Sequence, residues 1–159
     1  MSATVTATAR HRFERLGADA VYDAWLDAKT LRRWMARPMA RKAGKIEITR
    51  VDVDARIGGR FHFAEIRDGE VAESWGDYRA LERPSRIVFA WFVTPEEEQE
   101  DKSEVTIEIV PDGKSCIATI SHEMDAQWAD YVEPTARAWA AMLQAIDDTL
   151  GTGERDGAG

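Results

Sequence analysis

The order of the expected elements is the feature that most constrains the fold. One strand and one amphipathic helix are followed by a run of strand patterns over residues 46–124, and an amphipathic helix over Pro134–Leu150 comes last. A single sheet of this kind has an apolar face that another element must cover. The last helix is the expected cover, and a curved sheet that wraps around one long helix leaves a cavity between them. This order predicts an α+β fold that binds a small molecule.

The first helix is expected to open near Asp19 and to end before Pro38, because the residue that precedes a proline avoids helical angles. Its apolar stripe recurs at helical spacing from Val21 to Met35. Asp68-Gly69 is a strong hairpin signal between two strands. Residues 95–103 (PEEEQEDKS) are predicted to form an exposed, mobile loop, since apart from the proline they are polar or charged.

Alternation along two strands indicates which side chains face the core. Cys116, Ala118, Ile120 and His122 share the more apolar face of one strand and are placed inward. Glu65 shares a face with two phenylalanines, where burial would raise the pKa of its carboxyl unless it is paired.

Three interpretations of Glu65 are open. The strand can twist so that the carboxylate reaches solvent, it can pair with an arginine such as Arg79, or it can form an acid–base pair with His122. The first two are favoured. The alternation does not orient Asp77, Tyr78 and Arg79.

Charge and composition exclude several classes of function. With 21 basic and 29 acidic side chains the formal net charge is −8, which repels phosphate backbones and argues against nucleic acid as a partner. Six basic residues between Arg32 and Lys45 are interpreted as a solvated face. The single cysteine, Cys116, permits no internal disulfide, and the three histidines are scattered, so no metal site is expected.

No targeting signal and no run of membrane-spanning length occur in the sequence, which predicts a cytoplasmic protein without a membrane partner. Nucleophile-elbow, phosphate-loop, dinucleotide-binding and zinc-protease motifs do not occur either. We therefore expect no cofactor and assign no catalytic residue. Whether the protein is an enzyme stays open, with a non-enzymatic role favoured.

Short segments spread along the whole chain form an ordered set that is more specific than any one of them. They are VYDAWLD at 21–27, LRRW at 31–34, DARIGGRF at 54–61, WGDY at 75–78, IVFAW at 87–91, SEVTI at 103–107 and ISH at 120–122, followed by Trp139, Leu143 and Ile146.

This set resembles bacterial single-domain members of the family named for the activator of the heat-shock-protein-90 ATPase. That family belongs to the START-like, birch-pollen-allergen-like (SRPBCC) superfamily. The resemblance covers roughly residues 3–150 and implies a β-α-α-β(6)-α helix-grip fold, a curved antiparallel sheet around a long C-terminal helix with an internal cavity. Ala138 and Met35 depart from the Gly and Trp that the family often has there. We place the domain at 1–151 and expect a disordered tail at 152–159.

Six tryptophans indicate an aromatic cavity. Trp25 and Trp34 are expected in the core, whereas Trp75, Trp91 and Trp139 are the candidates for the cavity wall because they lie on the sheet and the last helix. His122 is expected to orient a ligand at the cavity mouth. The predicted ligand-binding set is Phe61, Phe63, Trp75, Tyr78, Trp91, His122, Trp139 and Met142.

The residues and the resemblance together suggest three functions. The first is binding of a hydrophobic or amphipathic small molecule in the cavity. The resemblance implies two alternatives, a co-chaperone that stimulates a chaperone ATPase in the stress response, and a cavity enzyme of cyclase, dehydratase or hydrolase type. The acidic charge and the single domain argue against a chaperone partner. A homodimer is compatible with the sequence but nothing in it demands one.

Overall fold

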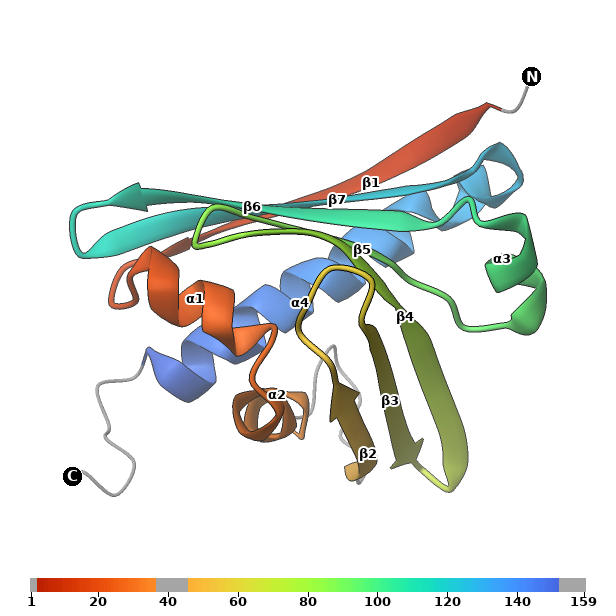
Figure 1. Ribbon diagram of the computed structural model, residues 1–159, viewed down its shortest axis with the longest axis horizontal. Coiled ribbons are helices and arrows are strands. Elements are labelled where there is room, and N and C mark those ends of the chain that lie inside the picture. Colours follow the sequence, from red (N-terminus) through yellow and green to blue (C-terminus); the bar gives the residue numbers. More distant parts are fainter. Residues whose placement is uncertain (1–2, 37–45, 152–159) are drawn as a thin grey trace.

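A computed structural model describes residues 3–36 and 46–151 of the 159-residue chain. Seven antiparallel strands form one curved sheet in the order β1-β7-β6-β5-β4-β3-β2 (Figure 1). The predicted tail, the predicted connector at 39–45 and most of the basic cluster lie outside the described residues. The strands are β1 (Thr4–Phe13), β2 (Ile46–Val53), β3 (Arg60–Arg67), β4 (Glu70–Glu82), β5 (Arg86–Ala90), β6 (Glu104–Asp112) and β7 (Ser115–Asp125).

The long helix α4 (Val132–Leu150) runs across the concave face of the sheet, as the sequence predicts (Figure 1). It follows a short 3-10 helix, η1 (Ala126–Tyr131). Trp139, Leu143 and Ile146 of its apolar stripe are buried against the sheet. The predicted α+β helix-grip fold is confirmed. Among the described residues no helix is long and apolar enough to cross a bilayer.

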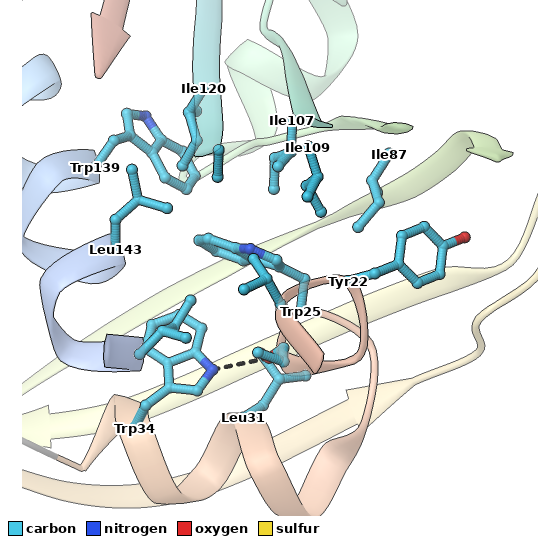
Figure 2. Close-up of a cluster of buried hydrophobic side chains, with 14 of the residues drawn as sticks. Tyr22, Trp25, Leu31, Trp34, Ile87, Ile107, Ile109, Ile120, Trp139 and Leu143 are labelled. Atoms are coloured by element: carbon cyan, nitrogen blue, oxygen red, sulfur yellow. Dashed lines mark hydrogen bonds between the residues drawn. The ribbon is translucent and has the colours of Figure 1, made fainter. Parts of the chain in front are cut away.

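The inward faces of the strands form one hydrophobic core with α4. Ile87, Ile107 and Ile120 have no exposed surface and point toward the helices (Figure 2). The inward placement of Cys116, Ala118, Ile120 and His122 on β7 is also confirmed, since all four side chains are buried. The Asp68-Gly69 turn joins β3 to β4 with positive φ at both residues, 52° and 84°, the backbone of the expected hairpin.

The first helical region is two helices, α1 (Ala18–Ala24) and α2 (Ala28–Met35), where the apolar periodicity alone predicted one. The break follows from Asp27, whose side chain accepts the Thr30 N–H at 3.0 Å and caps α2. The Trp34 indole N–H donates to the Ala24 carbonyl at 2.8 Å and ties α2 back to the end of α1. The apolar stripe continues across the break because both helices bury their apolar sides in the same core.

The acidic segment after β5 is a helix, α3 (Pro95–Glu100), so the prediction of a loop there was wrong. The Thr94 side chain accepts the Glu97 N–H at 3.1 Å, and Pro95 occupies the first helical position, where its missing N–H costs nothing. Glu98 accepts the indole N–H of Trp75 at 2.9 Å and an N–H of Arg60 at 3.1 Å. These bonds fix α3 against the outer face of β3 and β4.

Candidate functional site

A cavity of about 200 Å³ lies between the sheet, α2 and α4, and we call it the sheet cavity. Eight of its lining residues are aromatic, because β3, β4, β5 and the residue after it, the end of α1, α2 and α4 each contribute at least one ring. Trp25 stands 5.1 Å from Trp34 and 6.2 Å from Trp139 between ring centroids, and the three come from three different segments (Figure 2).

Phe61 is the centre of the aromatic wall on the sheet side. Its ring centroid lies 5.0 Å from Phe63, 5.5 Å from both Tyr78 and Phe89, and 5.9 Å from Trp91. Ring contacts at these distances are favourable beyond the area they bury, so the wall is preorganised. Burial also raises the pKa of the Tyr78 hydroxyl, which keeps this ring neutral.

Polar groups interrupt this wall at one edge. Glu65 is buried, forms an ion pair with Arg67, and both line the sheet cavity. The prediction that Glu65 pairs with an arginine is therefore confirmed, but the arginine is Arg67 and not Arg79. Arg79 pairs with Asp77 and with Asp101 on the outer side.

Two buried N–H groups on the lining residues of the sheet cavity have no hydrogen-bond acceptor within the described part of the chain. They are Nε1 of Trp25 and Nε of Arg67. A buried donor without an acceptor costs about 1–3 kcal/mol, and a ligand oxygen would relieve that cost.

A second cavity of about 410 Å³ lies between α3, the segment that leads into β6, the end of β7, η1 and the start of α4, and we call it the α3 cavity. Trp91, Val93, Trp139 and Met142 line both cavities. The rings of Trp91 and Trp139 meet edge to face with centroids 5.2 Å apart. This pair of indoles is the partition between the two spaces.

His122 lies in the α3 cavity, and its hydrogen bonds define its tautomer. The Trp139 indole N–H donates to His122 Nδ1 at 3.1 Å, so Nδ1 carries no proton and the ring hydrogen is on Nε2. Nε2 then donates to the Ser103 hydroxyl oxygen at 2.8 Å. Desolvation lowers the pKa of His122 to about 4, so the ring is neutral at physiological pH.

This arrangement bears on catalysis. A histidine that activates a serine must accept the hydroxyl proton, and here Nε2 already holds a proton. The hypothesised acid–base pair of Glu65 and His122 does not form either, because Glu65 lines the sheet cavity and His122 the α3 cavity. Among the described residues no cluster of three or more His, Cys, Asp or Glu side chains could hold a metal ion.

The structure brings most of the predicted site together. Phe61, Phe63, Tyr78, Trp91, Trp139 and Met142 all line the sheet cavity, and His122 lines the neighbouring space. The placement of Trp75 was wrong. Its side chain lies on the outer face, 5.8 Å from His62 between ring centroids, where its indole N–H bonds to Glu98.

Sequence reasoning missed several lining residues. Trp25 and Trp34 are buried as predicted, but both also line the sheet cavity. Arg67 and Ser103 carried no signal in the sequence, and Trp128 counted only among the six tryptophans, because only the fold brings these residues to the cavities.

These features define a class, the helix-grip proteins in which a curved sheet and a long last helix enclose a hydrophobic cavity. Within it, the sequence profile of the activator of Hsp90 ATPase homolog 1-like proteins matches residues 15–151, and the chain belongs to that family. No curated protein matches the sequence.

Solved bacterial structures share the fold at low sequence identity. Protein CV1439 from Chromobacterium violaceum is 20% identical with a TM-score of 0.71, over 91% of this chain and 96% of that one. Protein NE0264 from Nitrosomonas europaea is 14% identical with a TM-score of 0.73, over 92% and 94%. Protein Ms6760 from Mycobacterium smegmatis is 20% identical with a TM-score of 0.67, over 95% and 92%.

Proposed function

We propose that the protein binds a small apolar or amphipathic molecule in the sheet cavity. The observation that carries this proposal is a preformed aromatic space with an unused buried indole N–H, that of Trp25, on its lining. Cavities with largely apolar walls and a few polar groups are the usual form of a small-molecule site. An engineered apolar cavity of about 150 Å³ accepts benzene, so a space of about 200 Å³ suits one substituted ring.

The polar groups restrict the chemistry of the ligand. Trp25 can only donate, and Glu65 and Arg67 already neutralise each other. The ligand that satisfies this site is neutral, with a ring or a branched hydrocarbon that lies on Phe61, Phe63 and Trp91 and an oxygen that accepts from Trp25. Burying a charged ligand here would cost desolvation, and the Glu65–Arg67 pair offers it no free countercharge.

Two probes test this assignment. Acetophenone offers a carbonyl oxygen, and α-methylstyrene has the same shape with a methylene in its place. We expect calorimetry to show that acetophenone binds more tightly than α-methylstyrene. In Trp25→Phe, the ratio of the two affinities should fall about fivefold. Trp34→Phe is the matched control, because the indole N–H of Trp34 is already used by Ala24. Failure of both probes to bind, or equal loss of preference in the control, would contradict the proposal.

Native mass spectrometry of the protein purified from its own host gives the physiological ligand. A neutral molecule bound at near-unit occupancy supports the proposal and identifies its chemical class. The mass of the intact assembly also tests the homodimer, and fractionation of the host cells before purification tests the cytoplasmic location.

Stimulation of a chaperone ATPase is the second candidate, and the description of the family favours it. The measurement is the ATPase rate of the Hsp90-type chaperone of the same host with and without this protein. A rate increase that Trp25→Phe leaves intact would support a co-chaperone that does not depend on the sheet cavity.

A further inference from the structure

We propose that the α3 cavity is a second binding site, and that it takes an organic ammonium ion that carries an oxygen atom. This site is independent of the ligand proposed for the sheet cavity. Its volume of about 410 Å³ falls within the usual range for small-molecule sites. Three features of its walls, namely aromatic faces, an excess of carboxylates and the hydroxyl of Ser103, select this chemistry.

Aromatic rings supply the first feature. Trp91 and Trp139 form the wall that the α3 cavity shares with the sheet cavity, and Trp128 and Tyr131 of η1 also line it. Trp128 and Tyr131 hold each other edge to face, with ring centroids 5.6 Å apart. Tryptophan and tyrosine faces attract cations, and several rings around one space are the usual receptor for an alkylated ammonium.

Carboxylates supply the second feature. Lys102 is the cation of the lining, and it forms an ion pair with Asp125 at 2.8 Å. Glu97 and Glu100 of α3 also line the cavity and leave its walls with net negative charge. Glu97 is held in place because its carboxylate accepts the Val93 N–H at 2.8 Å while its own N–H is bound by Thr94. A cationic ligand would neutralise this charge next to the rings.

The hydroxyl of Ser103 supplies the third feature. Because His122 donates to the Ser103 oxygen, the hydroxyl hydrogen of Ser103 points elsewhere, and it has no acceptor among the described residues. Ser103 lines the α3 cavity. A ligand with an oxygen near its ammonium group can accept from Ser103 while the cation lies between the rings and α3.

Choline and 3,3-dimethylbutan-1-ol test this proposal, because they share one shape and differ in a charged nitrogen against a neutral carbon. Titration of the intact protein, followed by tryptophan fluorescence and calorimetry, is expected to show choline binding at least about tenfold more tightly than the neutral alcohol. Equal affinities would overturn the proposal, as would the absence of choline binding. Acetophenone binding to the same sample separates this result from the proposed function, since either ligand can fail alone.

Variants locate the site. The double variant Glu97→Gln/Glu100→Gln is expected to weaken choline binding about tenfold and to leave acetophenone binding unchanged. Glu96→Gln is the control for general charge, since Glu96 is an exposed residue of the same helix that is not among the lining residues.

Trp128→Leu is expected to weaken choline binding about fivefold, and Trp128→Phe to restore most of it, because an aromatic face returns. If Glu96→Gln weakens choline binding as much as the double variant does, the general negative charge of the protein attracts choline and no specific site is involved. Equal choline binding by Trp128→Leu and Trp128→Phe would show that the aromatic face of Trp128 does not contribute to binding. Each result would overturn the proposal.

Discussion

His122 shows at the residue scale how burial sets chemistry. Its ring is 5% exposed, and its pKa falls from about 6.5 to about 4 because the charged form is desolvated. His122 is therefore protonated near pH 6.5 in the unfolded chain but only near pH 4 in the folded protein. The contribution of His122 to the free energy of unfolding should be fully present above about pH 7 and fall by about 3 kcal/mol as the pH drops to 4.

The variant His122→Gln isolates this contribution. A glutamine amide can accept from Trp139 and donate to Ser103, but it does not titrate. Urea unfolding between pH 4 and 7 should show a smaller loss of stability in the variant than in the parent protein. The same pH dependence in both proteins would show that other groups cause it.

Gly76 is a second residue whose identity the fold dictates. It lies opposite Phe61 on the inward side of β4, and an added Cβ would stand 1.9 Å from the Ala90 carbonyl oxygen. Backbone cannot yield as a flexible side chain does, so Gly76→Ala should destabilise the protein by about 3 kcal/mol in chemical denaturation. Gly17→Ala is the control, because nothing lies within 4 Å of the position that its Cβ would take, and it should cost less than about 1 kcal/mol.

The same strand explains why one site residue could not be predicted. Ser74, Gly76 and Tyr78 point inward on β4, and Trp75 points outward. A serine and a glycine give no apolar signal, so hydrophobicity alone favoured the wrong face for Trp75. On β3 the phenylalanines mark the inward face, and there the prediction was right.

At the scale of elements, Glu98 provides the tertiary contact that holds α3. Glu98 holds both the Trp75 indole and Arg60, and these bonds lower the pKa of its carboxyl. A helix of six residues is unstable by itself, so these contacts decide whether α3 forms. Glu98→Ala should increase amide hydrogen exchange over residues 95–100 and cost about 1 kcal/mol.

Glu96→Ala is the control for this effect, since it removes a charge from the same helix. Equal exchange in the two variants would contradict the role of Glu98 in holding the helix. The expected choline site predicts a further difference, because α3 carries Glu97 and Glu100, and a loosened helix should bind choline more weakly.

Elements with a repeated hydrophobic pattern could be predicted from the sequence, whereas α3 and the break between α1 and α2 could not. The stripe of α4 and the alternation of β7 are repeated often enough to be decisive, and the structure confirms both. The break at Asp27 leaves the stripe of the first two helices intact, so periodicity cannot detect it. α3 is made by a cap, a proline and one tertiary contact, none of which appears as hydrophobic periodicity.

At the scale of the whole molecule, fold and site are separable. Solved structures at 14–20% identity share the fold over more than nine-tenths of this chain, so most individual side chains can differ while the fold stays the same. The two cavities depend instead on individual rings and charges. Their partition, the Trp91–Trp139 contact, sets the size of each cavity.

Removing one indole of the partition should join the two cavities. Trp91 lines both of them, so Trp91→Ala should admit a larger ring system while costing about 3 kcal/mol of stability. We expect 2-acetylnaphthalene to gain about tenfold in affinity relative to acetophenone in this variant, measured by calorimetry at a temperature where circular dichroism shows it folded. Trp75→Ala removes an indole from the outer face and should leave the ratio unchanged. An unchanged ratio in Trp91→Ala would mean that the two cavities remain separate, and that Trp91 does not limit ligand size.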